Sequence, residues 1–416
     1  MRHIIIGNSY AGINAVESIR EIDKDGEIIM ISDEPYRAYS RPLIAYYLSN
    51  RVTDSDMYYR EPTFYKKHRI RLFTGERVGG IDIEKQNISL ENGTSFRYER
   101  LLISTGGKPS VLKIKGFNAR NVFTFTKWDD AKKIRKFAKE EKRGIVLGGG
   151  LIGVKAAEGL NACGVKVMMV ISSPRILSLV LDEISGEIVN NHLRRSGIKT
   201  IIGHSVKDIL TNPKGDVCGV ILDNNKRLEC DILIIAKGVR PNIDFIKNTS
   251  IRINRGIIVD RQMRTNIKNI YAAGDVAEAW DILNNKNSVI AIAPLACEQG
   301  KIAGFNMAGV ERFYSGGIGM NSIVVAGLPV MTLGVSNTVN GNTEIKYFHK
   351  GRLYRKLVFH ENRLAGAILV GDVRYGGVLT HLISSQSDIK DIKKELVDYT
   401  LKTGEFISPS MGFSHN

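Results

Sequence analysis

Ile4-Ile5-Ile6-Gly7-Asn8-Ser9-Tyr10-Ala11-Gly12 is the stretch of sequence that decides the fold. Its three isoleucines form an uninterrupted apolar run, which predicts a strand buried on both faces of a parallel sheet. Gly7 permits the tight turn out of such a strand, and Gly12 lets the following helix pack closely against the sheet. The first amides of that helix and the positive end of its dipole suit a pyrophosphate. The stretch therefore predicts a dinucleotide-binding unit.

A second strand is expected over residues 28–31, and acidic residues follow it. Asp33 and Glu34 come about twenty residues after the turn, where an acid binds the adenosine ribose in dinucleotide-binding folds. The pattern is one residue short of G-x-G-x-x-G, because Ser9 stands at the place of the middle glycine. An ordinary strand, turn and helix with small residues at the bend is the alternative interpretation.

A second copy of the pattern supports the first interpretation. Residues 144–147 form another apolar run, and Gly148-Gly149-Gly150-Leu151-Ile152-Gly153 supplies the full G-x-G-x-x-G before a helix-like stretch. Two such units imply two dinucleotides, and two dinucleotides side by side imply electron transfer between them.

The next strand of this second unit, residues 167–171, ends without an acid. Ile171 stands at the expected place, and Ser172 and Arg175 follow it. A carboxylate there would accept a hydrogen bond from the 2′-hydroxyl of NAD and repel the 2′-phosphate of NADP. The sequence therefore leaves both NADH and NADPH open.

The composition is typical of a globular protein, with 43% apolar and 25% charged residues. No apolar run approaches the roughly 20 residues that span a bilayer, and the first strand begins too early to leave room for a signal peptide. We therefore expect a cytoplasmic protein with no membrane span. A chain of 416 residues has room for two or three domains.

The net charge is strongly positive, at +16 from 59 basic and 43 acidic residues. Such an excess speeds association with acidic partners and promotes non-specific binding to nucleic acid. Each basic run taken alone is interpreted as a solvated face, but the total favours an acidic partner.

The four cysteines show no redox or metal-binding spacing. Cys163, Cys218, Cys230 and Cys297 form neither C-x-x-C nor C-x-x-x-x-C, and they do not match iron–sulfur or zinc patterns. We expect scattered reduced cysteines and no metal site.

Three further glycine turns follow predicted strands. Ser104-Thr105-Gly106-Gly107, Lys237-Gly238-Val239-Arg240-Pro241 and Gly274-Asp275 each allow close approach of the backbone to a ligand. Asp275 is expected to accept a hydrogen bond from a ribityl hydroxyl, and Pro294-Leu295 begins a helix that ends near residue 308.

The chain changes character beyond residue 316. Strands are predicted at residues 324–325, 330–333, 344–348, 353–359 and 364–370, with a final helix from about residue 388. This pattern indicates a separate α+β domain.

Taken in order, these motifs resemble the two-dinucleotide flavoprotein reductases of the pyridine nucleotide–disulfide oxidoreductase-like superfamily, over almost the whole chain. The resemblance implies an α/β fold with two Rossmann-like domains in a three-layer, glutathione-reductase-like arrangement, plus a C-terminal α+β interface domain. It implies an FAD-binding domain split between residues 1–108 and 241–315, with an NAD(P)-binding domain inserted at 109–240. The C-terminal domain would span 316–405 and support a homodimer, and residues 406–416 would form a tail.

The resemblance also assigns residues to the two cofactors. For FAD it implies Gly7, Ser9, Tyr10, Ala11, Gly12, Asp33, Glu34, Arg41, Pro42, Val78, Ser104, Thr105, Gly106, Gly274, Asp275, Pro294 and Leu295. For NADH or NADPH it implies Gly148, Gly150, Leu151, Ile152, Gly153, Ser172, Arg175, Gly238 and Val239.

A narrower group is similar to segments 39–43, 150–158 and 369–373: NADH:rubredoxin or ferredoxin reductases, flavin portions of nitrite reductases, and flavoprotein subunits of 2-oxoacid oxidoreductases. Disulfide reductases of the superfamily carry cysteines early in the chain, whereas Cys163 is the first one here, which argues against disulfide chemistry. Ala45 stands where some relatives have a lysine near the flavin. Lys155 stands where many have a glutamate, and it either tunes the flavin potential or is a solvated helix lysine.

We therefore expect hydride transfer from NADH or NADPH to FAD, followed by electron transfer to an acidic iron–sulfur protein such as rubredoxin or ferredoxin. A subunit of a larger oxidoreductase, of the 2-oxoacid dehydrogenase or nitrite reductase type, is the first alternative. The second is a nucleic-acid-binding or signalling flavoprotein resembling apoptosis-inducing factor, although no specific nucleic-acid module is present.

Overall fold

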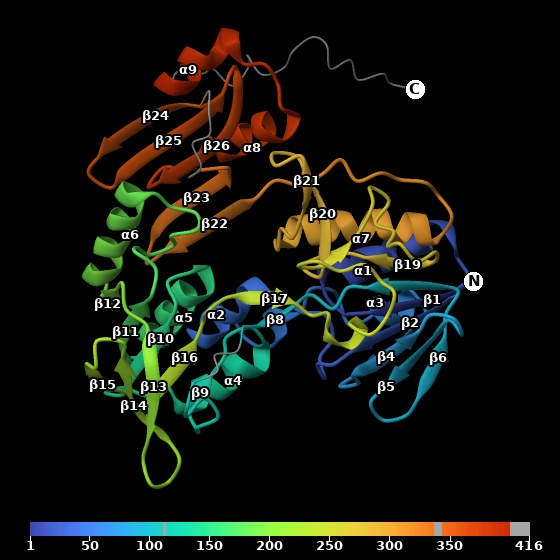
Figure 1. Cartoon of the computed structure of the whole chain (residues 1–416), viewed down its shortest axis with the longest axis horizontal. Helices are drawn as coiled ribbons and strands as arrows, with labels where there is room; N and C mark the ends of the chain where they lie inside the picture. The colour runs from blue at the N-terminus through green and yellow to red at the C-terminus, as the bar shows by residue number, and fades with distance from the viewer. Residues whose placement is uncertain (111–113, 337–342, 400–416) are drawn as a thin grey trace.

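The computed structural model describes residues 1–110, 114–336 and 343–399, which form three main sheet regions (Figure 1). The first region is a five-stranded parallel sheet with the order β19-β7-β1-β2-β3. Four of its strands precede residues 109–240 in the sequence and the fifth, β19, follows them. The sheet therefore combines strands from both sides of that segment. Its members are β1 (Arg2–Ile6), β2 (Glu27–Ser32), β3 (Ile70–Thr74), β7 (Arg100–Ile103) and β19 (Ile270–Ala272).

Two helices pack against each other beside this sheet, α1 (Tyr10–Ile22) and α7 (Ala293–Met307). Glycines of α7 bring the two backbones almost into contact. A Cβ atom on Gly300 would lie 2.2 Å from the carbonyl oxygen of Ala11, and one on Gly304 would lie 2.5 Å from that of Ala15. The small residues of α7 therefore fix how closely it packs on α1.

The second region repeats the first arrangement, with a parallel sheet in the order β12-β11-β10-β16-β9. Its strands are β9 (Val122–Phe123), β10 (Arg143–Leu147), β11 (Lys166–Ile171), β12 (Lys199–Ile202) and β16 (Ile232–Ile235). Helices α4 (Trp128–Phe137), α5 (Leu151–Ala162) and α6 (Glu183–Arg195) accompany it, and β13 (Val206–Thr211), β14 (Val217–Leu222) and β15 (Arg227–Glu229) form an antiparallel sheet beside it.

The third region is an antiparallel sheet with the order β22-β23-β26-β25-β24. All five strands predicted beyond residue 316 are present, as β22 (Met320–Val325), β23 (Leu328–Gly334), β24 (Thr343–Lys350), β25 (Leu353–His360) and β26 (Arg363–Val370). The final helix predicted from about residue 388 is present, but the structure adds a helix before it that the sequence did not predict. The structure has α8 (Gly376–Ser385), a 3₁₀ turn (Lys390–Ile392) and α9 (Lys393–Asp398).

The reason for that miss is local. Helix α8 begins with two glycines, which are poor helix formers, and it has no capping side chain. Packing against β23 and β26 stabilises it instead, with Leu379 and Ile383 fully buried. The predicted tail, residues 406–416, lies outside the described residues.

Shorter elements connect the regions. Strands β4 (Val78–Asp82), β5 (Asn87–Leu90) and β6 (Ser95–Arg97) form an antiparallel sheet, with a hairpin turn at residues 91–94 between β5 and β6. The antiparallel pair β8 (Gly107–Pro109) and β17 (Val239–Pro241) carries the chain between the first and second regions. The others are α2 (Ile44–Leu48), α3 (Phe64–Lys67), β18 (Ile257–Ile258), β20 (Ala277–Asp281), β21 (Lys286–Ser288) and 3₁₀ turns at Arg41–Leu43, Ser55–Met57 and Asp244–Ile246.

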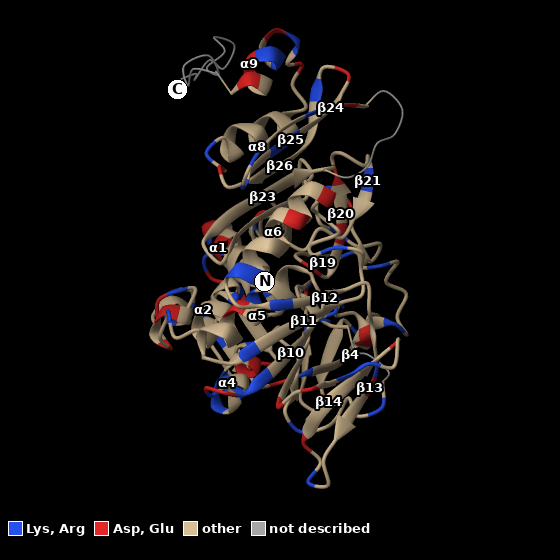
Figure 2. Ribbon diagram, turned by 90° about the vertical axis from the view of Figure 1, so that its left-hand side faces the viewer, with Lys and Arg blue, Asp and Glu red and all other residues tan. Residues whose placement is uncertain are grey.

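The α/β fold class with two Rossmann-like sheets and a C-terminal α+β region is thus confirmed. Among the described residues, no helix is both long enough and apolar enough to cross a membrane. Basic and acidic positions are spread over all three regions (Figure 2).

Candidate functional site

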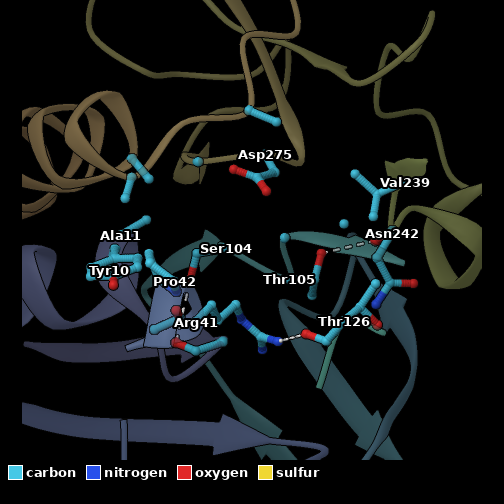
Figure 3. A pocket seen from close by; sticks show the side chains of 18 of the residues that line it. Tyr10, Ala11, Arg41, Pro42, Ser104, Thr105, Thr126, Val239, Asn242 and Asp275 are labelled. Carbon is cyan, nitrogen blue, oxygen red and sulfur yellow. Dashed lines mark hydrogen bonds between the residues drawn. The ribbon is translucent and has the colours of Figure 1, made fainter. Parts of the chain in front are cut away.

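A cavity of about 690 Å³ lies where the three sheet regions meet, and it collects residues from widely separated parts of the chain. Figure 3 shows the side chains around it. Eighteen of the residues predicted to bind a cofactor or tune the flavin line this cavity: Gly7, Ser9, Tyr10, Ala11, Asp33, Glu34, Arg41, Pro42, Val78, Ser104, Thr105, Gly106, Leu151, Ile152, Lys155, Val239, Gly274 and Asp275.

The first glycine turn forms one wall. Gly7 has φ +124° and a Cβ there would lie 2.1 Å from the carbonyl oxygen of Ser104, so this position requires glycine. Gly12 lies behind the wall, where a Cβ would lie 2.2 Å from the carbonyl oxygen of Gly7. Helix α1 begins directly after Ser9, which makes no side-chain capping bond. A pyrophosphate fits this uncapped helix start.

The two acids after β2 have different environments. Glu34 is only 6% exposed and accepts hydrogen bonds from the Tyr39 hydroxyl, at 2.7 Å, and from Arg41. Asp33 is paired with Lys127 Nζ at 2.8 Å. A carboxylate has about four acceptor positions, so Glu34 can still accept from a ribose hydroxyl in the cavity.

Asp275 projects into the cavity from the opposite side (Figure 3). Burial raises the pKa of its carboxyl. Gly274 before it has φ +80°, and its amide donates to Gln299 Oε1 at 2.8 Å, which fixes the turn. A partly buried carboxylate in this position is suited to accept hydrogen bonds from hydroxyl groups of a bound ligand.

The second glycine turn has the geometry of the first. Gly148 has φ +126°, and a Cβ there would lie 2.2 Å from the carbonyl oxygen of Ala236; a Cβ on Gly153 would lie 2.2 Å from that of Gly148. Gly148, Gly150 and Gly153 are outside the cavity lining, but Leu151 and Ile152 at the start of α5 belong to it.

Lys155 of α5 also lines the cavity. Its Nζ atom lies 2.6 Å from Glu158 Oε2 and donates to the carbonyl oxygen of Val324 at 3.1 Å. The side chain is 22% exposed, so it is a partly buried, paired group rather than a freely solvated one.

Several predicted residues lie away from the cavity. Pro294 and Leu295 are in the first turn of α7, where Ala293 and Ala296 line the cavity instead. Gly238 lies outside the lining as well. Ser172 and Arg175 follow β11; Ser172 accepts from Lys237, and Arg175 Nε donates to the carbonyl oxygen of Leu181 at 2.9 Å.

Some residues that line the cavity are not predicted from the sequence. Residues 320–324 of β22 form one side of the cavity, Thr126 and Asn242 contribute from loops, and Phe245 contributes from the 3₁₀ turn Asp244–Ile246. No motif marks them, because they reach the cavity only through tertiary packing. Lys237 lies outside the cavity lining, and the glycine-turn motif that contains it predicts no role for its side chain.

No cysteine lines the cavity in the described part of the chain, and all four cysteines are free. Within the same residues, no group of three or more His, Cys, Asp or Glu side chains could hold a metal ion.

Comparison with known proteins extends these observations. The family model "Pyridine nucleotide-disulphide oxidoreductase" matches residues 1–300, and "Rubredoxin NAD+ reductase C-terminal domain" matches residues 320–387. The chain is 30% identical to the NADH-rubredoxin oxidoreductase of Clostridium acetobutylicum over 94% of this chain and 96% of that protein. It is also 30% identical to the assimilatory nitrate reductase electron transfer subunit of Bacillus subtilis, over 95% of this chain but about half (51%) of that longer protein.

Solved structures agree with the fold. The crystal structure of the Clostridium acetobutylicum NADH:rubredoxin oxidoreductase superposes with a TM-score of 0.79 at 29% identity, covering 96% of this chain and 99% of that one. A covalent putidaredoxin reductase–putidaredoxin complex gives a TM-score of 0.87 at 21% identity, covering 96% and 98%, and shows the shared fold. The family is one of flavoproteins that use NAD(P)H, and the uncapped turn, Glu34 and Asp275 fit FAD. The chain belongs to the pyridine nucleotide-disulphide oxidoreductase family and carries the C-terminal domain of rubredoxin reductases.

Proposed function

We propose that this chain is an FAD-dependent NAD(P)H oxidoreductase that passes electrons to a small acidic iron–sulfur protein. One observation carries the proposal: the helix that follows the second glycine turn reaches the cavity of the first. Leu151, Ile152 and Lys155 line the same space as Gly7 and Asp275. Two dinucleotides held at these turns would meet in one cavity, as hydride transfer requires.

Different residues of the chain would bind different parts of FAD. The Gly7 turn and the start of α1 would hold the FAD pyrophosphate, Glu34 the ribose and Asp275 the ribityl chain. When bound, FAD would supply the chemistry that takes up two electrons as a hydride and passes them on one at a time. Lys155 would place a positive charge beside the flavin. The split FAD-binding domain, the inserted NAD(P)-binding domain and a homodimer formed through the C-terminal region are parts of this proposal.

We also propose that no disulfide takes part in the reaction. The chain has no cysteine before Cys163, and none of its four cysteines lines the cavity among the described residues. Cys230 is buried, which raises the pKa of its thiol to about 12 and disfavours the reactive thiolate.

The acceptor is inferred from charge and from relatives. The net charge of +16 favours an acidic partner, and a relative similar over its full length is named an NADH-rubredoxin oxidoreductase. Rubredoxins and ferredoxins have the required chemistry, a one-electron centre in a small acidic protein.

The experiment is an anaerobic visible spectrum of the purified protein before and after addition of NADH, and separately of NADPH. We expect bleaching of a flavin spectrum by at least one nucleotide, followed by reduction of an added rubredoxin or ferredoxin. The rate of that second step should fall as NaCl rises from 50 to 500 mM, because exposed charges are screened over about 10 Å at 0.1 M salt. A flavin that neither nucleotide bleaches would refute the proposed activity.

A second candidate is an electron-transfer subunit of a larger oxidoreductase. It is supported by 28% identity to the NADH-dependent phenylglyoxylate dehydrogenase subunit epsilon of Aromatoleum evansii, over 98% of this chain and 97% of that one. In that case, the isolated chain would reduce artificial acceptors with NADH but neither rubredoxin nor ferredoxin. Co-purification with iron–sulfur subunits from the native host would favour this candidate.

A further inference from the structure

Beside the second glycine turn, a lysine and a serine form a hydrogen bond outside the cavity described above. Lys237 follows β16 and Ser172 follows β11, and Lys237 Nζ donates to Ser172 Oγ at 2.9 Å. Strand β10 and its turn lie between these two strands. A Cβ on Gly148 would lie 3.6 Å from the Lys237 amide nitrogen, so the lysine begins at the turn and reaches across it.

Among the residues that the structure describes, no acidic side chain pairs with the lysine ammonium. The structure gives Lys237 no ion pair among the described residues, although its side chain is only partly exposed. Burial lowers the pKa of Lys237, and no carboxylate in the described ranges offsets that effect. An anionic ligand at this place would therefore stabilise the charged lysine.

Two other polar side chains near the carboxyl ends of these strands already have hydrogen-bond or ion-pair partners. Arg175 is turned toward Leu181, and a Cβ on Gly186 would lie 3.2 Å from its Cδ atom, so the arginine lies against α6. His204, after β12, pairs with Asp223 at 2.7 Å. Ser172 is exposed at the end of β11, where the adenosine ribose of a dinucleotide lies in this fold.

We infer that Lys237 and Ser172 form the subsite for the 2′-phosphate of NADPH, and that the chain uses NADPH in preference to NADH. This inference rests on the proposed function, since it concerns the nucleotide that the second turn would hold. A phosphate monoester carries close to two negative charges at neutral pH and offers three acceptor oxygens. The Lys237 ammonium and the Ser172 hydroxyl supply a charge-assisted and a neutral donor for them. Ile171 supplies no carboxylate to repel it.

The test uses two ligands that differ only in this phosphate, 2′,5′-ADP and 5′-AMP, with calorimetric titration of the purified FAD-loaded protein. We expect 2′,5′-ADP to bind about ten- to a hundredfold more tightly than 5′-AMP. Lys237→Met keeps the length of the side chain without its charge and should remove most of that difference, whereas 5′-AMP should bind as before. The matched control is Lys207→Met, on the exposed side of β13, which should leave both affinities unchanged.

A converse variant adds the missing carboxylate. Ser172→Asp should lower the affinity for 2′,5′-ADP and raise the affinity for NADH. A carboxylate accepts a hydrogen bond from the 2′-hydroxyl and repels the 2′-phosphate.

Equal affinities of the unmodified protein for 2′,5′-ADP and 5′-AMP would overturn the inference. So would an equal loss of both ligands in Lys237→Met, which would place the lysine on the 5′-phosphate. These results are separable from the fate of the proposed function. Flavin bleaching by NADH with no preference for 2′,5′-ADP would leave the reductase standing without this subsite. A clear preference with no bleaching by either nucleotide would leave the subsite without the reductase.

Discussion

Lys155 Nζ lies 2.6 Å from Glu158 Oε2, one helical turn further along α5, on the wall of the central cavity. The lysine also donates to Val324 in β22, and the amide of Ala326 donates to Glu158. This pair therefore joins the second region to the C-terminal sheet and holds one positive charge at a fixed place in the cavity.

Replacing Lys155 by Met should lower the reduction potential of the bound flavin. A positive charge near the flavin favours the electron-rich form, and its loss leaves the Glu158 carboxylate without its partner. We expect a fall of about 30 mV, which corresponds to about 1.4 kcal/mol for a two-electron couple. Equilibration with a reference dye measures it. Lys155→Arg keeps the charge and serves as the control; an unchanged potential in Lys155→Met would argue against proximity to the flavin.

Gly7→Ala should abolish retention of FAD. The added Cβ would lie 2.1 Å from the Ser104 carbonyl oxygen, and φ +124° is unfavourable for alanine. We expect a loss of stability of more than about 1 kcal/mol and little flavin absorbance in the purified protein. Gly79→Ala is a suitable control, since its Cβ would have no neighbour closer than 3.5 Å. Flavin content equal in the two variants would contradict the role assigned to the turn.

Asp275→Asn should weaken FAD binding and stabilise the FAD-free protein. Burial raises the pKa of Asp275, so ionising it costs the folded protein stability. That cost is absent below the ordinary pKa of 3.8 and grows as the pH rises above it. Melting of FAD-free protein at pH 4 and pH 8 is the measurement. We expect the asparagine variant to gain stability relative to the original at pH 8, but not at pH 4, and to bind FAD about tenfold more weakly. A lower stability of the asparagine variant than of the original protein at pH 8 would contradict this prediction.

Asp23→Asn should destabilise the protein at neutral pH by about 1 kcal/mol, allowing for solvent screening at this partly exposed position. Burial opposes ionisation of Asp23, but the His3 ring at 3.0 Å and the Gly26 amide at 2.7 Å outweigh it and lower its pKa to about 2. The stabilisation is complete above the ordinary pKa of 3.8 and disappears as the pH falls through about 2.

Urea unfolding at pH 7 and at pH 2.5 measures this difference, which should shrink at the lower pH. The control is Asp25→Asn, whose exposed pair with Arg69 is worth little. A constant difference between the two pH values would show that the charge of Asp23 is not responsible.

The local motifs made much of the fold predictable. The apolar runs before Gly7 and Gly148 identified β1 and β10, because a strand buried on both faces has no polar alternation. The glycine turns then located most of the cavity, since positive φ and close backbone contacts require glycine there. Helix α8 was missed because tertiary packing, rather than local preference, stabilises it.

Side-chain pairing could not be predicted in the same way. The contact of Lys155 with Val324 and that of Lys237 with Ser172 join residues far apart in the sequence. Arg175 was expected at the nucleotide, but its Nε atom is used within its own loop. Which donor finds which acceptor depends on side-chain directions that neither periodicity nor spacing encodes.

The pairing of β7 with β19, and of α1 with α7, has a consequence for the order of assembly on the ribosome. Strand β10 and its neighbours through β16 are complete in the growing chain before β19 has been synthesised. The edge of β7 and the face of α1 that receives Gly300 and Gly304 stay uncovered during that interval. Contacts between such distant segments form slowly. The second region can therefore fold first, and the central cavity closes only when α7 arrives.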